Sequence, residues 1–255
     1  MVQKKNSTTA NSGLAKVAVQ FSADSFVVNQ SLVLRINICG ENRHLRQAAK
    51  RYVQPNIAIV LTMNKPNRAS TLWNKASKSL GNYQKYIEGK QTEFELTLVD
   101  LLYISNFKGG NASIHEDQEE LDHKLKEYSK VLKLIHEEFY SRSLVQLSDL
   151  EMKRLIELAK MFLNLKDNLD TAIDGFKASF LSTILHSHFP DLFPILDRRL
   201  LVNMDLVHKI DLSKSKQVRN IGEFYPKLIE KVRDICKASN KSIRKVDEEY
   251  FSIQF

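Results

Sequence analysis

The apolar residues of this chain recur at the three- and four-residue spacing that places them on one face of a helix. The clearest case lies between residues 114 and 139, where five apolar side chains alternate with charged ones: Leu121, Leu125, Tyr128, Leu132 and Ile135. Because an α-helix turns once in about 3.6 residues, this segment would bury one stripe and expose the rest. The spacing therefore predicts a helix packed against neighbours of the same kind.

The same spacing predicts helices along most of the chain, over residues 68–86, 93–105, 147–163, 198–208, 225–238 and 242–253. Ser148 followed by Glu151 forms a capping box at the start of one of them. The fold class is therefore expected to be mainly α.

The N-terminal part of the chain shows a strand-like pattern instead of the helical spacing. Residues 16–21 and 32–38 alternate apolar and polar side chains, which suggests short strands and a small β element. One buried helix over 26–38 is an open alternative. Residues 1–13 are polar and are expected to form a disordered tail, with a single domain over 14–255.

Charge and cysteine content limit the possible partners. The 255 residues carry a formal net charge of +8, which favours polyanions such as nucleic acid, although a merely basic soluble protein would give the same value. Cys39 and Cys236 lie far apart, so neither a disulfide framework, a zinc site nor a four-cysteine iron–sulfur cluster is indicated. We expect no metal and no cofactor.

The sequence contains no apolar run that approaches the length of a membrane helix, and no apolar segment follows the lysines at the N-terminus. We therefore expect a cytoplasmic protein that does not bind membranes.

The segment from Gly175 to Asp197 is the part of the chain from which a chemical function can be inferred most directly. Its sequence is GFKASFLSTILHSHFPDLFPILD. A glycine opens a turn, a short apolar helix follows, and the run Phe193–Leu196 leads to Asp197. A carboxylate at the end of such a run is expected to be partly buried, which strengthens its electrostatic interactions. Asp197 could also be the N-cap of a helix that begins at Arg198, and the two roles are compatible.

This segment resembles the hairpin and catalytic aspartate of the helix-hairpin-helix (HhH-GPD) DNA glycosylases. In that family a turn of the form G-V-G-x-[K or S] starts a helix, and an aspartate follows eighteen positions after the Lys or Ser. Gly175 matches the first glycine, Ser179 the Lys or Ser position and Asp197 the aspartate, without a gap, while Lys177 stands at the second glycine. The approach FPILD is similar to that of the adenine-specific mismatch branch. The resemblance covers about a tenth of the chain.

The resemblance implies a two-lobed helical bundle whose cleft accepts an extruded nucleotide, with the hairpin and catalytic residue within 168–200. The first helix of the hairpin would be very short and would cover residues 168–174. Asp197 would be the catalytic carboxylate that stabilises the positive charge developing on the sugar. Because Ser179 has no amine, it cannot form the imine used by bifunctional members. The implied enzyme is a monofunctional N-glycosylase that leaves an abasic site in double-stranded DNA, without lyase activity.

The implied DNA contacts begin at the hairpin. Gly175, Phe176 and Lys177 precede a helix whose free N–H groups can receive a phosphate, and Ser179 and Arg198 flank the aspartate.

A second contact is expected from the sequence ISNFKGGNAS, which looks like the loop that family members push into the duplex. Asn106 with Phe107 would be the wedge, and Lys108 would hold a phosphate. An ordinary interhelical loop that ends the helix at Gly109 and Gly110 is the alternative.

The base pocket is expected beside the hairpin helix. Ser179, Thr183 and His186 stand at i, i+4 and i+7 and so share one face. If Ser179 faces the active site, Thr183 and His186 could contact a flipped base, together with Tyr103. A purely structural histidine is the alternative for His186.

Because little of the chain outside the hairpin looks like a standard repair glycosylase, we expect a specialised role, such as bacterial defence against phage DNA with modified bases. The rival hypothesis is a non-catalytic helix-hairpin-helix module that binds nucleic acid, or a subunit of a defence complex. A third possibility is that FPILD arose by coincidence in an unrelated helical protein.

Overall fold

The computed structural model describes residues 26–28, 31–37, 57–62, 68–109 and 114–253, with the backbone alone for the first three ranges and for 68–70. The chain divides into two compact units, residues 1–67 and 68–255. The single domain expected over 14–255 is therefore replaced by two units with a boundary at residue 67. The tail expected at 1–13 and the strand expected at 16–21 lie outside the described residues.

The N-terminal unit contains a three-stranded sheet in the order β1 (Phe26–Val28), β2 (Ser31–Asn37) and β3 (Ile57–Thr62). β1 pairs antiparallel with β2, and β2 pairs parallel with β3, from Leu32 opposite Ile57 to Asn37 opposite Thr62. The expected β element and its strand at 32–38 are confirmed, and the alternative of one helix over 26–38 is wrong.

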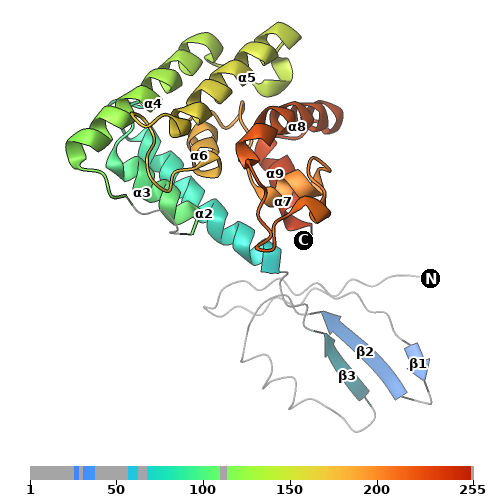
Figure 1. The fold of residues 1–255 in the computed structure, drawn as a ribbon. Helices are drawn as coiled ribbons and strands as arrows, with labels where there is room; N and C mark the ends of the chain where they lie inside the picture. The colour runs from blue at the N-terminus through green and yellow to red at the C-terminus, as the bar shows by residue number, and fades with distance from the viewer. Residues whose placement is uncertain (1–25, 29–30, 38–56, 63–67, 110–113, 254–255) are drawn as a thin grey trace. The chain divides into compact units, whose positions relative to one another are not determined.

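The C-terminal unit is helical (Figure 1). Its α-helices are α2 (Arg68–Glu88), α3 (Leu98–Phe107), α4 (Gln118–Phe139), α5 (Asp149–Asn164), α6 (Ala178–His188), α7 (Arg198–Asn203), α8 (Tyr225–Ser239) and α9 (Ile243–Ser252). Short 3-10 turns lie at η1 (Leu144–Gln146), η2 (Leu165–Asp167), η3 (Lys209–Asp211) and η4 (Ile221–Phe224). The expectation of a mainly helical chain is confirmed. In the described part of the chain, no helix has the length and apolar character needed to cross a membrane.

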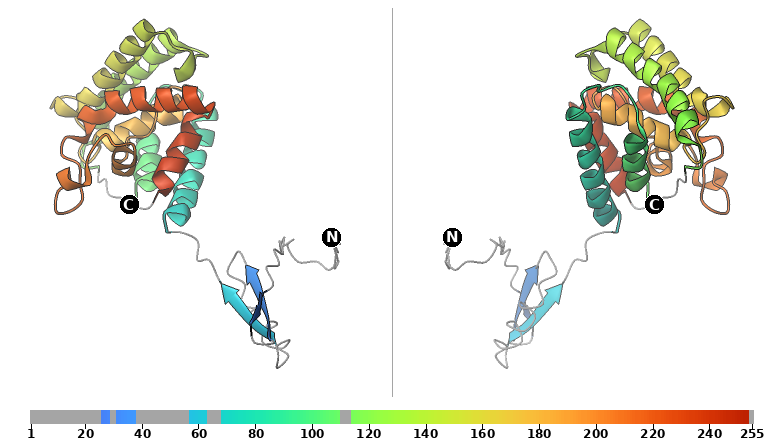
Figure 2. Two further views of the ribbon diagram at one scale, coloured as in Figure 1. Left: turned by 90° about the vertical axis from the view of Figure 1, so that its right-hand side faces the viewer. Right: turned by 90° about the vertical axis from the view of Figure 1, so that its left-hand side faces the viewer.

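Helix α6 is the central element of this unit, and it packs against α2, α3, α5 and η4 (Figures 1 and 2). Nine of its eleven residues are buried, as expected for a helix with neighbours on all sides. Several of the buried residues are polar: Ser182, Thr183, His186, Ser187 and His188. Ser182 and His186 hydrogen-bond the segment that follows α6. Thr183 and Ser187 donate to carbonyls of α6 itself, and the ring nitrogens of His188 have no hydrogen-bond partner within the described residues.

Three helix boundaries differ from the expected ones by four or five residues. α3 begins at Leu98 rather than at 93, because the Thr97 N–H and hydroxyl both donate to Asp100 (2.7 and 2.8 Å) and fix the start of the helix. α4 begins at Gln118 rather than at 114, and α7 ends at Asn203 rather than at 208.

The short helix expected at 168–174 is absent. The Asn168 side chain accepts from the Asp170 N–H (3.1 Å), and its carbonyl accepts from Thr171 and Ala172 (3.0 and 2.7 Å). These local bonds close a turn that competes with a helix. The segment before Gly175 is therefore α5, η2 and this turn.

Asp100 ties α2 to α3. Its carboxylate is fully buried and accepts from the Tyr83 hydroxyl (3.0 Å), from both Thr97 donors and from the Lys90 ammonium (3.0 Å). A buried carboxylate is tolerated when every oxygen is hydrogen-bonded and its charge is paired.

We predict that Asp100→Ala lowers the free energy of unfolding by about 3–5 kcal/mol, because it leaves the Lys90 ammonium buried without its partner. Urea denaturation measures this change. Asp234→Ala, on the exposed side of α8, should stay within about 0.5 kcal/mol of the unaltered protein. Equal losses in the two variants would contradict the role given to Asp100.

Candidate functional site

The run Phe193–Leu196 is buried but belongs to no helix or strand, so its backbone groups need other partners. Five side chains supply them, and we call this set the backbone clamp. Three of them donate to carbonyl groups: His186 Nδ1 to that of Phe193 (2.7 Å), the Tyr225 hydroxyl to that of Pro194 (2.9 Å) and the Ser179 hydroxyl to that of Leu196 (2.8 Å). The other two accept from N–H groups: Asp247 Oδ2 from that of Ile195 (3.4 Å) and Ser182 Oγ from that of Leu196 (2.9 Å).

The clamp draws on three helices, α6 and the two consecutive helices α8 and α9, which lie far from α6 in sequence. Ser179, Ser182 and His186 share one face of α6, since they are spaced by three and four residues. Tyr225 begins α8 and Asp247 lies on α9. The path of the run, and with it the position of the residue that follows, is therefore fixed from several sides.

Asp197 follows the run and is half-buried. It is the N-cap of α7, with Oδ1 accepting from the Arg199 N–H (2.8 Å), so the N-cap role considered for it is confirmed. Ser179 bonds the carbonyl of the residue directly before Asp197, so the two positions that were matched to the family motif lie together. Arg198 donates to the Lys216 carbonyl (2.7 Å).

The hairpin turn before α6 contains a glycine with a positive φ. Gly175 has φ 76°, in the left-handed region that glycine enters without strain. Lys177 is the exposed N-cap of α6 and has φ −84°, so a side chain fits where the family has its second glycine. Phe176, by contrast, is buried and packs edge-on against Phe180 (5.3 Å between ring centroids).

Thr183 and His186 share the face of Ser179 as expected, but this face packs against the run 193–196. The Thr183 hydroxyl donates to the Ser179 carbonyl (3.0 Å), and both side chains are at most 1% exposed. Burial lowers the pKa of His186 to about 4, so its imidazole is neutral. This arrangement matches the structural alternative for His186. Tyr103 is half-buried and stacks on Tyr86 (5.1 Å).

Asn106 and Phe107 belong to the last turn of α3 rather than to a loop. The helix continues because the Lys108 N–H bonds the Ile104 carbonyl (3.0 Å), and the chain turns only at Gly109, with φ 93°. Asn106 Nδ2 donates to Ser79 Oγ on α2 (2.9 Å).

The Lys108 side chain is half-buried, and its ammonium interacts electrostatically with Asp197 and Asp247. Loss of hydration lowers the pKa of Lys108 to about 8, against the opposing effect of the two carboxylates. Lys108 therefore interacts electrostatically with Asp197, and the phosphate contact expected from the sequence stays a prediction.

Asp247 is a buried carboxyl with an incomplete set of partners. It is 1% exposed, and Oδ1 makes no hydrogen bond within the described part of the chain. Burial raises the pKa of Asp247 to about 7, and the charge of Asp197 acts in the same direction, whereas Arg244 and Lys108 lower it. The Arg244 guanidinium stacks over Trp73 (3.8 Å to the ring centroid) and donates to Ser77 (2.8 Å).

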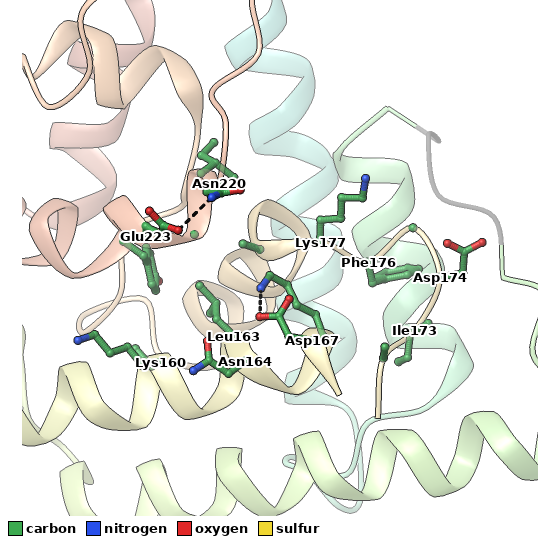
Figure 3. A pocket seen from close by; sticks show the side chains of 18 of the residues that line it. Lys160, Leu163, Asn164, Asp167, Ile173, Asp174, Phe176, Lys177, Asn220 and Glu223 are labelled. Carbon is green, nitrogen blue, oxygen red and sulfur yellow. Dashed lines mark hydrogen bonds and ion pairs between the residues drawn. The ribbon is translucent and has the colours of Figure 1, made fainter. Parts of the chain in front are cut away.

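A pocket of about 1130 Å³ adjoins the hairpin turn (Figure 3). Gly175 to Ala178, the end of α5 with η2, and η4 line it, and Lys160, Lys177 and the hydrogen-bonded pair Asn220 and Glu223 face it. Asp197 is not among its lining residues. The structure therefore separates this pocket from the carboxylate.

No family model, curated protein or solved structure matches this chain. Among the residues that the structure describes, no group of three or more His, Cys, Asp or Glu side chains is arranged to hold a metal ion.

Three members of the clamp had no role in the sequence-based prediction: Ser182, Tyr225 and Asp247. A signal exists for Asp247, because Ile243, Val246, Asp247 and Tyr250 share one face of α9. A carboxylate on an otherwise apolar face indicates a buried polar contact.

We predict that Ser182→Ala lowers the free energy of unfolding by about 1–3 kcal/mol, because it leaves the buried Leu196 N–H without an acceptor. Ser187→Ala is the matched control, since Ser187 is also buried on α6 but donates only to the Thr183 carbonyl of its own helix (2.7 Å). Denaturant titration of both variants measures the difference. A loss for Ser187→Ala as large as that for Ser182→Ala would argue against the clamp.

We predict that Asp247→Asn stabilises the protein at pH 8 by an amount on the order of a few kcal/mol and has little effect near pH 4. The folded-state pKa of Asp247, about 7, lies above its ordinary value of 3.8, so the unaltered protein loses stability as pH rises between these values. Because asparagine does not ionise, the Asp247→Asn variant avoids this loss of stability. Thermal unfolding at several pH values tests this, and a gain that does not depend on pH would refute it.

Proposed function

We propose that this protein is a DNA N-glycosylase of the helix-hairpin-helix type, in which Asp197 is the catalytic carboxylate. One observation carries the proposal: the Ser179 hydroxyl bonds the carbonyl of the residue directly before Asp197, and the turn at Gly175 has a positive φ. The spacing that resembles the family motif thus corresponds to a spatial contact. The two-lobed fold with a nucleotide-binding cleft forms part of the same proposal.

The chemistry follows from the position of Asp197. Breaking the bond between C1' and the base leaves positive charge on the sugar, and a nearby carboxylate stabilises that charge. The Arg199 N–H holds Oδ1, and partial burial strengthens the electrostatic effect. Water then adds its oxygen to C1', and the base departs with a proton. Ser179 supplies no amine, so this step is hydrolytic.

DNA would be anchored by the start of α6. The N–H groups of Ala178 and Ser179 lie in the first helical turn, where no preceding carbonyl of the helix can accept them, and the exposed Lys177 adds positive charge. We propose double-stranded DNA as the partner, and phage DNA with modified bases as the substrate in bacterial defence.

A non-catalytic nucleic-acid-binding module, or a subunit of a defence complex, is the second candidate. It is favoured by the burial of Thr183 and His186, which leaves the base without the contacts expected from α6. The two candidates differ in what Asp197 does beyond capping α7.

We predict that Asp197→Asn keeps the fold and DNA binding but lowers base excision by roughly 10²-fold or more. Asparagine caps helices as well as aspartate does, so the substitution removes the charge and leaves the cap. The assay incubates the protein with a panel of modified DNA, including phage DNA with glucosylated hydroxymethylcytosine, and then cleaves abasic sites with alkali.

The matched control is Asp205→Asn, which alters another aspartate shortly after α7. Undiminished cleavage by Asp197→Asn would rule out the catalytic role. Salt-sensitive DNA binding by the unaltered protein, with no excision on any substrate, would favour the binding module.

A further inference from the structure

The segment between α7 and α8 carries a cluster of positive charge. Residues 208–219 contain four Lys or Arg side chains and a single carboxylate, Asp211, which gives the segment a net charge of +3 out of +8 for the whole chain. Lys214, Lys216 and Arg219 are exposed, and none of them forms an ion pair within the described part of the chain. Exposed like charges without counter-charges attract a polyanion.

Hydrogen bonds fix the shape of this segment. The Ser213 N–H donates to the Gln217 carbonyl (2.9 Å), and the Gln217 N–H donates to Ser213 Oγ (2.9 Å). Within this turn Lys216 has φ 58°, a left-handed conformation that strains a residue other than glycine. The fold alone therefore does not account for a lysine at position 216.

Two contacts place the segment beside the proposed active site. The Arg198 guanidinium donates to the Lys216 carbonyl (2.7 Å), and Arg198 directly follows Asp197. At the end of the segment, Asn220 lines the same pocket as Lys177 (Figure 3). The cationic segment is thus connected both to the residue next to Asp197 and to the pocket that Lys177 faces.

The apolar residues of the segment favour a nucleic acid over a membrane surface. Of its three apolar side chains, Leu212 and Val218 pack against the core, and Ile210 is 90% exposed. A segment that lies on a membrane buries a wide apolar face in the lipid, and one isoleucine does not supply it. Phosphate binding needs only cations and hydrogen-bond donors.

We propose that Lys214, Lys216 and Arg219 bind backbone phosphates of double-stranded DNA and form a second anchor, separate from the start of α6. The inference rests on the proposed function, which supplies DNA as the partner. Ammonium and guanidinium groups neutralise phosphates irrespective of base sequence. The second anchor holds the duplex beside Asp197 while a base is extruded.

The test measures binding of the full chain to an unmodified synthetic duplex by fluorescence anisotropy at several salt concentrations. The anchor variant combines Lys214→Gln, Lys216→Gln and Arg219→Gln. Each lost phosphate contact reduces the slope of log K against log salt concentration by about 0.9, so the slope should fall in magnitude by about 2–3.

The matched control removes the same charge from the exposed sides of α4 and α5, and its slope should not change. It combines Lys126→Gln, Lys133→Gln and Lys153→Gln.

Lys216→Gly separates binding from folding. Glycine adopts the left-handed conformation without strain, so the midpoint of urea unfolding should not fall, while the salt slope should fall in magnitude by about 1. A lower midpoint together with unchanged binding would show that Lys216 serves the fold and would contradict the inference.

The outcomes distinguish this inference from the proposed function. An unchanged slope in the anchor variant, or an equal fall in the control, overturns the inference and leaves the proposed glycosylase intact. A reduced slope in the anchor variant alone, with no excision by the unaltered protein, keeps the anchor and rejects catalysis at Asp197. Failure of the unaltered protein to bind the duplex overturns both.

If the anchor variant does not fold, acetylation of the unaltered protein decides the question. Duplex DNA should protect Lys214 and Lys216 from acetylation, as read by mass spectrometry. Protection by phosphatidylserine vesicles but not by DNA would assign the segment to a membrane surface and overturn the inference.

Discussion

The hydrogen bonds to the backbone of Phe193–Leu196 are the constraint on which the proposed site depends. This run crosses the core of the helical unit without a helix or strand to satisfy its polar groups. Each unmatched buried group would cost about 1–3 kcal/mol, and several together would approach the whole stability of a typical domain. The clamp removes that cost with side chains from α6, α8 and α9, and as a result the position of Asp197 depends on these three helices.

This constraint also explains where the sequence allowed a correct prediction and where it did not. Apolar spacing predicted the helices, and Ser148 followed by Glu151 predicted the capping box of α5, because periodicity and capping are local properties. The same spacing put Ser179, Thr183 and His186 on one face, but it could not tell whether that face meets a ligand or the chain itself. The His186 imidazole donates to the Phe193 carbonyl, and no local sequence pattern predicts this contact between separate segments. The helix expected at 168–174 failed for a local reason, the Asn168 turn.

The charges near Asp197 form a second level of organisation. Lys108, Arg244 and Asp247 interact with one another and, through Lys108 and Asp247, with Asp197, so the protonation of one group affects the others. Asp247 also bonds the run that leads to Asp197. Electrostatic and backbone constraints therefore meet at the same place, the position of Asp197.

The most direct test of the proposed function is a search for a free nucleobase. The protein is incubated with DNA from phages that carry different modified bases, and small products are analysed by liquid chromatography and mass spectrometry. We predict release of an intact base, with an abasic site left in the strand. Release of nucleotides instead, or no small product from any substrate although the protein binds the DNA, would contradict a glycosylase centred on Asp197.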